Sequence, residues 1–521
     1  MTDRFLSATP LPKTRESAGL SSAALGAWAA AALAVAVFAL HAAVSNNYDF
    51  YRDELYFIVC GQHPALGYVD QPPLIPLLAA ASQLFGESRI AIHLIAALGG
   101  AATVLVACAT VRLLRGGVWA QVLAGMAAGF APIYLALAST LSTSTFEPLA
   151  WGLTAYFLLR AVLERDRRAL LFAGLVVGVA LETKYGIPFY VAALLLGLAL
   201  TPERKLLRTR EFALAVAIAA ALFAPNFVWQ LRHGFPMLPV LLANVDHKDL
   251  VLSPPEFLAN QALMMNPLLA PVWLAGLVAP FAGERWRRLR FLSIAFAAVF
   301  LVMLALHAKN YYLSPAYVAA FAVGAVALER SLLSLRLRNA YLGLAFASTA
   351  VLAPLPIPML APEQYLIYEH ALGFHDAPVE TRAQSRIPQL FADMTGWHDL
   401  ARSVAVAYDR LAPEDRAHAA IFTYNYGEAS AIDLFGGALG LPKALSGHNN
   451  FYLWGPGKAD GHVVLLVGAK LARLSSQCRE ASVVGSFGAP FALPEEHGDI
   501  VLCRDLGQGF HAAWTHLRHY D

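Results

Sequence analysis

The chain has 521 residues, of which 58% are hydrophobic and only 14% are Asp, Glu, Lys or Arg. Soluble domains carry about 25% charged residues, so this composition, with repeated apolar runs near the ~20 residues of a membrane span, excludes an ordinary soluble chain and predicts a polytopic α-helical membrane protein. The formal net charge of +2 lacks the basic excess typical of nucleic-acid-binding proteins.

Apolar runs predict about eleven transmembrane helices. They cover approximately residues 20–44, 90–114, 118–138, 148–163, two spans within 169–200, then 212–229, 267–282, 291–306, 311–328 and 340–358. Each half of 169–200 is short for a span, so a re-entrant hairpin also fits there. The polar segment 1–19 precedes an apolar run too long for the h-region of a signal peptide, and we expect both to be retained.

The distribution of basic residues predicts the orientation. Segment 1–19 and the loops on its side hold twenty Lys and Arg residues, whereas the opposite loops hold six: Arg52, Arg89, Lys184, Arg232, Lys248 and Lys309. Cytoplasmic loops are enriched in Lys and Arg, so the amino terminus is predicted to be cytoplasmic and residues 360–521 extracytoplasmic.

The first outer loop, residues 45–89, contains the sequences YRDEL and GYVDQPPL. Asp53 and Glu54 are candidate catalytic carboxylates, because a partly shielded carboxylate can take the proton of an acceptor hydroxyl. On spacing alone, capping of a helix or exposure to water is the commoner explanation for such a pair. Asp70 precedes two prolines and an apolar run, a pattern typical of a helix cap, or it also faces a cavity.

Further polar residues lie where the predicted spans meet the outer side. Glu147 could pair with Arg52 or Lys184 or contact substrate, since ionisable groups at membrane depth face a cavity or a partner. Lys184, His307 and Lys309 could stabilise a departing phosphate or extend to lipid headgroups. Tyr311 and Tyr312 could contact a phosphate, although tyrosines at such positions more often belong to an interfacial belt.

The last segment, 360–521, contains no predicted span. Its alternating helical and strand patterns predict a small α/β domain. Polar, aromatic turns around Tyr426, Glu428, His448 and Asn449 could contact an acceptor, although turn packing also explains them. Cys478 and Cys503 could form a disulfide or remain two separate buried thiols.

YRDEL, GYVDQPPL, FEPL, ETKYG and KNYYLSP, in this order between Tyr48 and Pro315, resemble the protein O-mannosyltransferase-like family of GT-C glycosyltransferases. NYGEASAIDLFG and LSGHNNFYLWGP are similar to motifs of its bacterial members, which include lipid A aminoarabinose transferases. The likeness implies a GT-C-type membrane domain at 20–359 and a periplasmic domain at 360–521, in the bacterial inner membrane.

The family implies an inverting transfer from a polyprenyl-phosphate-linked monosaccharide to a lipid, glycan or protein acceptor. Its catalytic acid falls on Asp53 and a second cavity carboxylate on Asp70, whereas Arg52 and Gln71 adjoin the donor site. Lys184 and the 309–312 turn would contact the phosphate. Gln71 stands where bacterial relatives often have Lys, and Glu147 where Asp is common.

The resemblance implies no required cofactor, although a divalent metal stays open, and it leaves the sugar, the acceptor and the oligomeric state unassigned. A lipid or sugar-lipid flippase without chemistry is the alternative, because many spans with cavity carboxylates could also serve transport. Against it stand the position of the acidic cluster on one side and the C-terminal domain.

Overall fold

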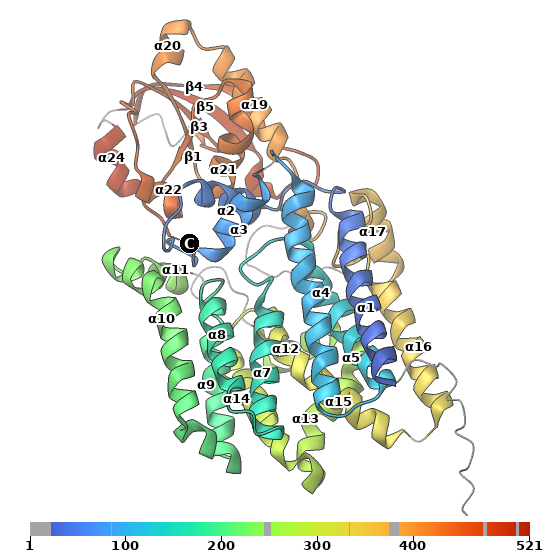
Figure 1. Ribbon diagram of the computed structural model, residues 1–521. Coiled ribbons are helices and arrows are strands. Elements are labelled where there is room, and N and C mark those ends of the chain that lie inside the picture. The colour runs from blue at the N-terminus through green and yellow to red at the C-terminus, as the bar shows by residue number, and fades with distance from the viewer. Residues whose placement is uncertain are drawn as a thin grey trace, which may run out of the picture.

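The computed structural model describes residues 22–84, 86–243, 252–332, 334–374, 385–471, 477–506 and 510–520. The predicted segment 1–19 lies outside these residues. Figure 1 shows a bundle of long helices with a sheet-containing C-terminal part at one end, and the short helices α2 and α3 between the two.

Most helices of the bundle follow the predicted spans. The bundle helices are α1 (Ser22–Val44), α4 (Arg89–Leu113), α5 (Val118–Phe130), α6 (Pro132–Ser139), α7 (Glu147–Leu163), α8 (Ala169–Leu181), α9 (Ile187–Ala199), α10 (Arg210–Arg232), α11 (Met237–Ala243), α12 (Pro254–Met264), α13 (Ala270–Val278), α14 (Arg290–Ala305), α15 (Tyr317–Ser331) and α16 (Leu335–Leu352). Of these, α11 and α12 lie in the connection between the predicted spans 212–229 and 267–282. Among the described residues, five helices are long and apolar enough to cross a membrane, or eight if each bent pair is one span. The polytopic class is confirmed, and the count of eleven is not.

Several predicted spans are broken helices with a local cause. The predicted span 118–138 is α5 followed by α6, bent by 55°. The bend falls at Ala131, whose extended backbone is the conformation favoured before a proline, and Pro132 starts α6 without needing its missing N–H. Residues 169–200 form two helices, α8 and α9, joined by a turn at 182–186.

That turn is attached to the first outer loop. The Leu74 N–H donates to the Glu182 carbonyl at 2.9 Å. The contact brings Lys184 to the same end of the bundle as α2 (Arg52–Gln62) and α3 (Leu74–Ser82).

Close helix contacts in the bundle use small residues. A Cβ on Gly324 of α15 would overlap the carbonyl oxygen of Val272 of α13, and one on Gly276 of α13 would overlap that of Ala320. Small residues let helix backbones approach closely where lipid removes the hydrophobic drive for association.

The C-terminal part contains a five-stranded sheet of order β2-β1-β3-β5-β4. Its strands are β1 (Ala419–Thr423), β2 (Ala444–Ser446), β3 (Val463–Val467), β4 (Cys478–Phe487) and β5 (Gly498–Leu506). β1 pairs in parallel with β2 and β3, whereas β5 is antiparallel to both β3 and β4. The predicted α/β character of this segment is present.

The helices of this part are α17 (Pro362–Ala371), α18 (Gln389–Ala392), α19 (Trp397–Asp409), α20 (Pro413–His418), α21 (Tyr426–Phe435), α22 (Asn449–Trp454) and α24 (Phe510–Leu517). Of these, α19 and α21 pack on one face of the sheet and α24 on the other. Leu465 faces the cluster that includes α19 and α21, and Val464 faces the cluster that includes α24. This alternation is the period of two expected of a strand.

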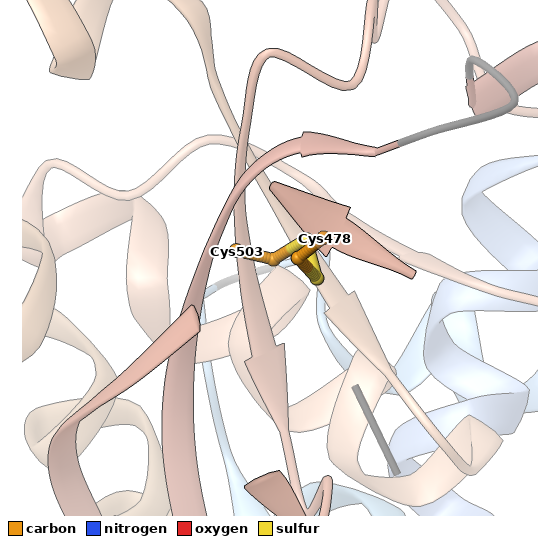
Figure 2. The surroundings of a disulfide bond; sticks show 2 residues. All are labelled: Cys478 and Cys503. Carbon is orange, nitrogen blue, oxygen red and sulfur yellow. A yellow bond between two sulfur atoms is a disulfide. The ribbon is translucent and has the colours of Figure 1, made fainter. Parts of the chain in front are cut away.

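Cys478 and Cys503 form a disulfide, with an S–S distance of 2.07 Å (Figure 2). The bond joins β4 to β5, the two strands at one edge of the sheet. The pairing that the sequence left open is therefore present.

The C-terminal part packs directly on the first outer loop. Leu55 and Ile58 of α2 belong to the same buried cluster as Ile432 and Phe435 of α21. Gly427 makes the approach close, because a Cβ there would lie 2.6 Å from the Arg52 Cγ. α2 thus shares its apolar contacts between the bundle side and the C-terminal part.

Candidate active site

Two adjoining cavities lie where the bundle, α2 and the C-terminal part meet. The first cavity measures about 370 Å³ and the second about 360 Å³. The residues that line both are Tyr51, Asp53, Thr143, Lys184, Lys309, Tyr311, Tyr312 and Gln389. The two cavities are therefore branches that meet at Asp53 and the two lysines.

Asp53 sits in the first turn of α2 with its side chain 30% exposed. Its Oδ1 accepts a hydrogen bond of 2.8 Å from the Tyr426 hydroxyl. Helix geometry separates it from its neighbour Glu54, because successive helical residues point about 100° apart. Asp53 consequently faces the cavities while Glu54 turns into the protein.

Glu54 is fully buried and does not line either cavity. Its carboxylate accepts the Tyr51 N–H at 2.9 Å and the Leu141 N–H at 2.7 Å, and it lies 3.1 Å from the His93 Nε2. The structure does not support its assignment as a catalytic carboxylate. Glu54 instead closes the start of α2 as in a capping box and links it to α4 and the 140–146 loop.

Asp70 lines the first cavity. Its carboxylate accepts hydrogen bonds from the Tyr56 hydroxyl at 3.0 Å and from the Asn449 side-chain amide at 3.2 Å. Gln71 is buried, outside the cavity linings, with its Nε2 3.9 Å from the Cys60 Sγ. The structure therefore does not place Gln71 at a donor site.

Lys184 is the best-defined cation of the site. Its ammonium donates to the Ser144 hydroxyl at 2.6 Å and pairs with Glu147 at 3.2 Å. The same ammonium lies 4.0 Å from the centre of the Tyr312 ring, a cation–π contact. Of the two partners predicted for Glu147, Lys184 is the one observed.

The 307–312 turn contributes unevenly. Lys309, Tyr311 and Tyr312 line both cavities, whereas the exposed His307 is not among the lining residues. The backbone at His307 has a positive φ of 50°. The structure thus separates His307 from the candidate phosphate contacts.

Arg52 ties the cavity wall to the C-terminal part. It is 5% exposed, with its guanidinium 3.5 Å from Asp393 and 3.1 Å from Glu495. Burial opposes its charge, but the carboxylates, Asp393 foremost, outweigh that effect and hold the pKa of Arg52 well above its usual range. Arg52 lines the first cavity as a paired charge.

The four residues predicted for acceptor contact have different surroundings. Tyr426 lines the first cavity. His448 and Asn449 are buried beside it, and the His448 Nδ1 accepts the Tyr426 N–H at 3.4 Å. Glu428 is buried outside the cavities, where burial and the nearby Glu496 raise its pKa well above the usual range.

Sequence reasoning did not select Tyr51 and Gln389, which line both cavities. Tyr51 directly precedes the RDE triplet, so the motif itself pointed toward it. Gln389 carries no local signal, because only the docking of the C-terminal part brings it to the bundle.

Among the described residues, no group of three or more His, Cys, Asp or Glu side chains could hold a metal ion.

Comparison with known proteins supports the resemblance. Residues 70–229 match the family described as dolichyl-phosphate-mannose-protein mannosyltransferase. The lipid A galacturonosyltransferase RgtD of Rhizobium johnstonii is 31% identical over 209 residues, which are 39% of this chain and 43% of RgtD. The chain thus aligns with less than half the length of this curated relative.

The fold is shared with ArnT from Cupriavidus metallidurans. The crystal structure bound to undecaprenyl phosphate aligns with a TM-score of 0.58 at 16% identity, covering 90% of this chain and 97% of ArnT. The apo structure gives the same TM-score and identity, covering 92% and 98%. The predicted likeness to this family is confirmed by the match of residues 70–229, and the chain shares the fold of ArnT.

Proposed function

We propose that this protein is a membrane glycosyltransferase that moves a monosaccharide from a polyprenyl-phosphate-linked donor to an acceptor on the extracytoplasmic face. One observation carries the proposal: Asp53 and Lys184 line the same first cavity, whose lining includes apolar residues of the bundle helices. In a displacement at a sugar carbon, the carboxylate can take the proton of the attacking hydroxyl, and the cation can stabilise the leaving phosphate. The glycosyltransferase names of the matched family and of RgtD support this reaction class.

We assign the first cavity to the donor. Part of its lining is apolar and includes Trp151, Phe189, Val240, Leu241 and Met303. Such a lining suits the first isoprene units of a polyprenyl chain, because apolar surface is removed from water there. The undecaprenyl phosphate bound to ArnT, which has the same fold, supports a donor of this class.

The donor phosphate would then lie against Lys184, with Lys309 and Tyr312 beside it. Lys184 already interacts with Glu147 and Ser144, so its ammonium is held in place before a ligand arrives. A pre-positioned cation stabilises the developing charge on the leaving phosphate without reorganisation during the reaction.

We assign the second cavity to the acceptor. Four serine and threonine residues, Thr140, Ser142, Thr143 and Ser144, line it together with the apolar Ile133, Ala136 and Leu137. This mixed lining suits an amphipathic molecule with a polar, hydroxylated head. RgtD acts on lipid A by its name, which supports a lipid acceptor of that kind.

In the proposed reaction, Asp53 removes the proton of the acceptor hydroxyl as that oxygen forms a bond to the anomeric carbon. The bond from this carbon to the phosphate oxygen breaks on the opposite side. Its electron pair leaves with polyprenyl phosphate, whose charge Lys184 stabilises. Attack opposite the leaving group inverts the anomeric configuration.

The proposed location is the bacterial inner membrane, with the amino terminus cytoplasmic, residues 20–359 as the catalytic domain and 360–521 as a periplasmic domain. The basic residues concentrated in alternate loops support this orientation. Lipid-linked donors suit this side, because nucleotide sugars are cytoplasmic metabolites.

The test uses purified protein in nanodiscs with labelled undecaprenyl-phosphate sugars, galacturonic acid first, and lipid A as acceptor. Wild type should release undecaprenyl phosphate and label lipid A, whereas Asp53→Asn should lower turnover at least ~100-fold, since a general base contributes about that much. Binding of undecaprenyl phosphate and the melting temperature should stay near wild type.

Near-normal turnover in Asp53→Asn would reject the assignment of the base. Movement of intact donor across the bilayer without release of undecaprenyl phosphate would favour the flippase alternative. Mass spectrometry of envelope lipids from a deletion strain then identifies the sugar and acceptor that the cell uses.

A further inference from the structure

Two carboxylates that line the first cavity are hydrogen-bonded by side chains of the C-terminal part. The Tyr426 hydroxyl donates to the Asp53 Oδ1 at 2.8 Å, and the Asn449 side-chain amide donates to the Asp70 Oδ2 at 3.2 Å. The donors begin two different helices, α21 and α22, of the same part of the molecule. Both carboxylates, Asp53 and Asp70, therefore accept a hydrogen bond from the C-terminal part.

Tyr426 is held on several sides. Its ring lies 4.7 Å from the Tyr56 ring and 4.8 Å from the His448 ring, centre to centre, and the Arg52 guanidinium lies 5.7 Å from the ring centre. α21 itself is fixed at its start, because the Asn425 side chain accepts the Glu428 N–H at 2.9 Å. The hydroxyl thus reaches Asp53 from a rigid support.

Asn449 belongs to a second set of contacts with the first outer loop. The neighbouring Asn450 accepts the Val69 N–H at 2.7 Å, and the Asn450 N–H donates to the Tyr56 hydroxyl at 3.3 Å. The Tyr56 hydroxyl in turn donates to the Asp70 Oδ1. Both oxygens of Asp70 are therefore engaged by a network that spans the interface.

We infer that Tyr426 and Asn449 are positioning residues of the active site, so that the C-terminal part orients Asp53 and Asp70 rather than only capping the bundle. The inference rests on the proposed function. A partly exposed aspartate at the start of a helix has more than one staggered side-chain conformation available. A hydrogen bond from a fixed phenol selects the one that faces the acceptor, and loss of such orientation costs rate rather than binding.

The test compares Tyr426→Phe with Tyr424→Phe in the full-length protein in nanodiscs. The first change removes the hydroxyl and keeps the ring packing, whereas Tyr424 lies two residues away with 70% of its surface exposed and serves as the matched control. For Tyr426→Phe, we expect kcat to fall roughly tenfold, the loss of one hydrogen bond to a charged group, with the KM for donor within about twofold of wild type. Tyr424→Phe should match wild type.

Asn449→Ala gives a second, independent measurement on Asp70, with the same expected split between kcat and KM. The number of competent sites is counted in each variant by binding of undecaprenyl phosphate, and kcat is expressed per site. If both Tyr426→Phe and Asn449→Ala keep the wild-type kcat per site, the inference is overturned. It is equally overturned if the loss appears only in the number of sites, because that is a folding effect.

The two proposals fail in different ways. If wild type releases no undecaprenyl phosphate from any labelled donor while binding it, the reaction assigned to the site is wrong. If wild type and Tyr424→Phe turn over normally, and both Tyr426→Phe and Asn449→Ala do too, the reaction stands and only the positioning role is lost.

Discussion

Three consecutive charged residues at the start of α2 meet three different surroundings. Arg52 pairs with Asp393 and Glu495, Asp53 faces the cavities, and Glu54 is enclosed between α2, α4 and the 140–146 loop. One helical turn thereby joins the C-terminal part, the chamber and the bundle. The neighbours of Asp53 on both sides are fixed, which limits how far α2 can move at the site.

The different roles of Asp53 and Glu54 predict different consequences of mutation. Glu54→Ala should leave the buried N–H of Leu141 and the ring of His93 without their acceptor, which costs about 3 kcal/mol or more in stability. We expect a clearly lower melting temperature in detergent for Glu54→Ala.

Asp53→Asn is the matched control, because that side chain is partly exposed. It should melt close to wild type. Equal melting temperatures for wild type and Glu54→Ala would show that the buried contacts of Glu54 contribute little.

The sequence identified Asp53 but could not separate it from Glu54 or discard Gln71. Adjacent carboxylates look alike in a motif, and which one faces a cavity depends on the rotation of α2 within the fold. Gln71 follows Asp70 directly, yet it packs against Cys60 of α2. Local pattern therefore located the loop, and tertiary packing decided which of its residues reach the chamber.

At the scale of elements, apolar runs predict the positions of the bundle helices well. They predict the number of membrane crossings less well. α1, α4 and α10 match the predicted spans within about three residues and are long enough to cross. Pairs such as α5 and α6 do not form one straight helix, because Pro132 interrupts the pattern. Hydropathy alone registers the apolar length but not the bend.

The crossing of α13 and α15 depends on Gly324. A Cβ at this position would overlap a backbone oxygen, which cannot rotate away as a side chain can. Gly324→Ala should therefore push the helices apart and lower stability by about 2 kcal/mol or more. The measurement is thermal melting in detergent, with the bound fraction of undecaprenyl phosphate as a second readout.

Gly343 of α16 provides the control, because no atom of the described residues lies within 4 Å of a Cβ built there. Gly343→Ala should be neutral or stabilising by up to about 1 kcal/mol, since Ala has the higher helix propensity. The same loss in both variants would mean that helix propensity or lipid contact, rather than the crossing, sets the effect.

At the scale of the whole molecule, the decisive contact is between residues far apart in sequence. Asp53 and Tyr426 are separated by 373 residues, so no local pattern could predict their hydrogen bond. The YNYGE turn, residues 424–428, stood out in the sequence for its polar and aromatic residues. One of them, Tyr426, makes the hydrogen bond across the interface. The α/β segment was predictable from its strands, whereas its docking on α2 was not.

The interface between the two parts should depend on pH. Burial raises the pKa of Glu496 to about 7, although the nearby Arg52 acts in the opposite direction. A carboxyl group whose pKa is raised in the folded state binds its proton more tightly there than in the unfolded chain. Its contribution to stability is fully present below about pH 4.5 and is lost as the pH rises through about 7.

The melting temperature of the C-terminal part should therefore be about 2–5 °C higher at pH 5.5 than at pH 8. Glu496→Gln removes the titrating group and should reduce this difference. An unchanged difference in Glu496→Gln would assign the pH dependence to other groups, such as His398, whose pKa Asp49 raises.

The bond between Cys478 and Cys503 also bears on where the chain resides in a cell. A reducing cytosol keeps such pairs as thiols, whereas the compartment beyond the bacterial inner membrane oxidises them. The oxidation state of these two sulfurs, read by alkylation of intact cells before lysis, is thus a built-in marker of sidedness. The buried Cys60 and Cys108, which form no disulfide, supply an internal reference in the same polypeptide.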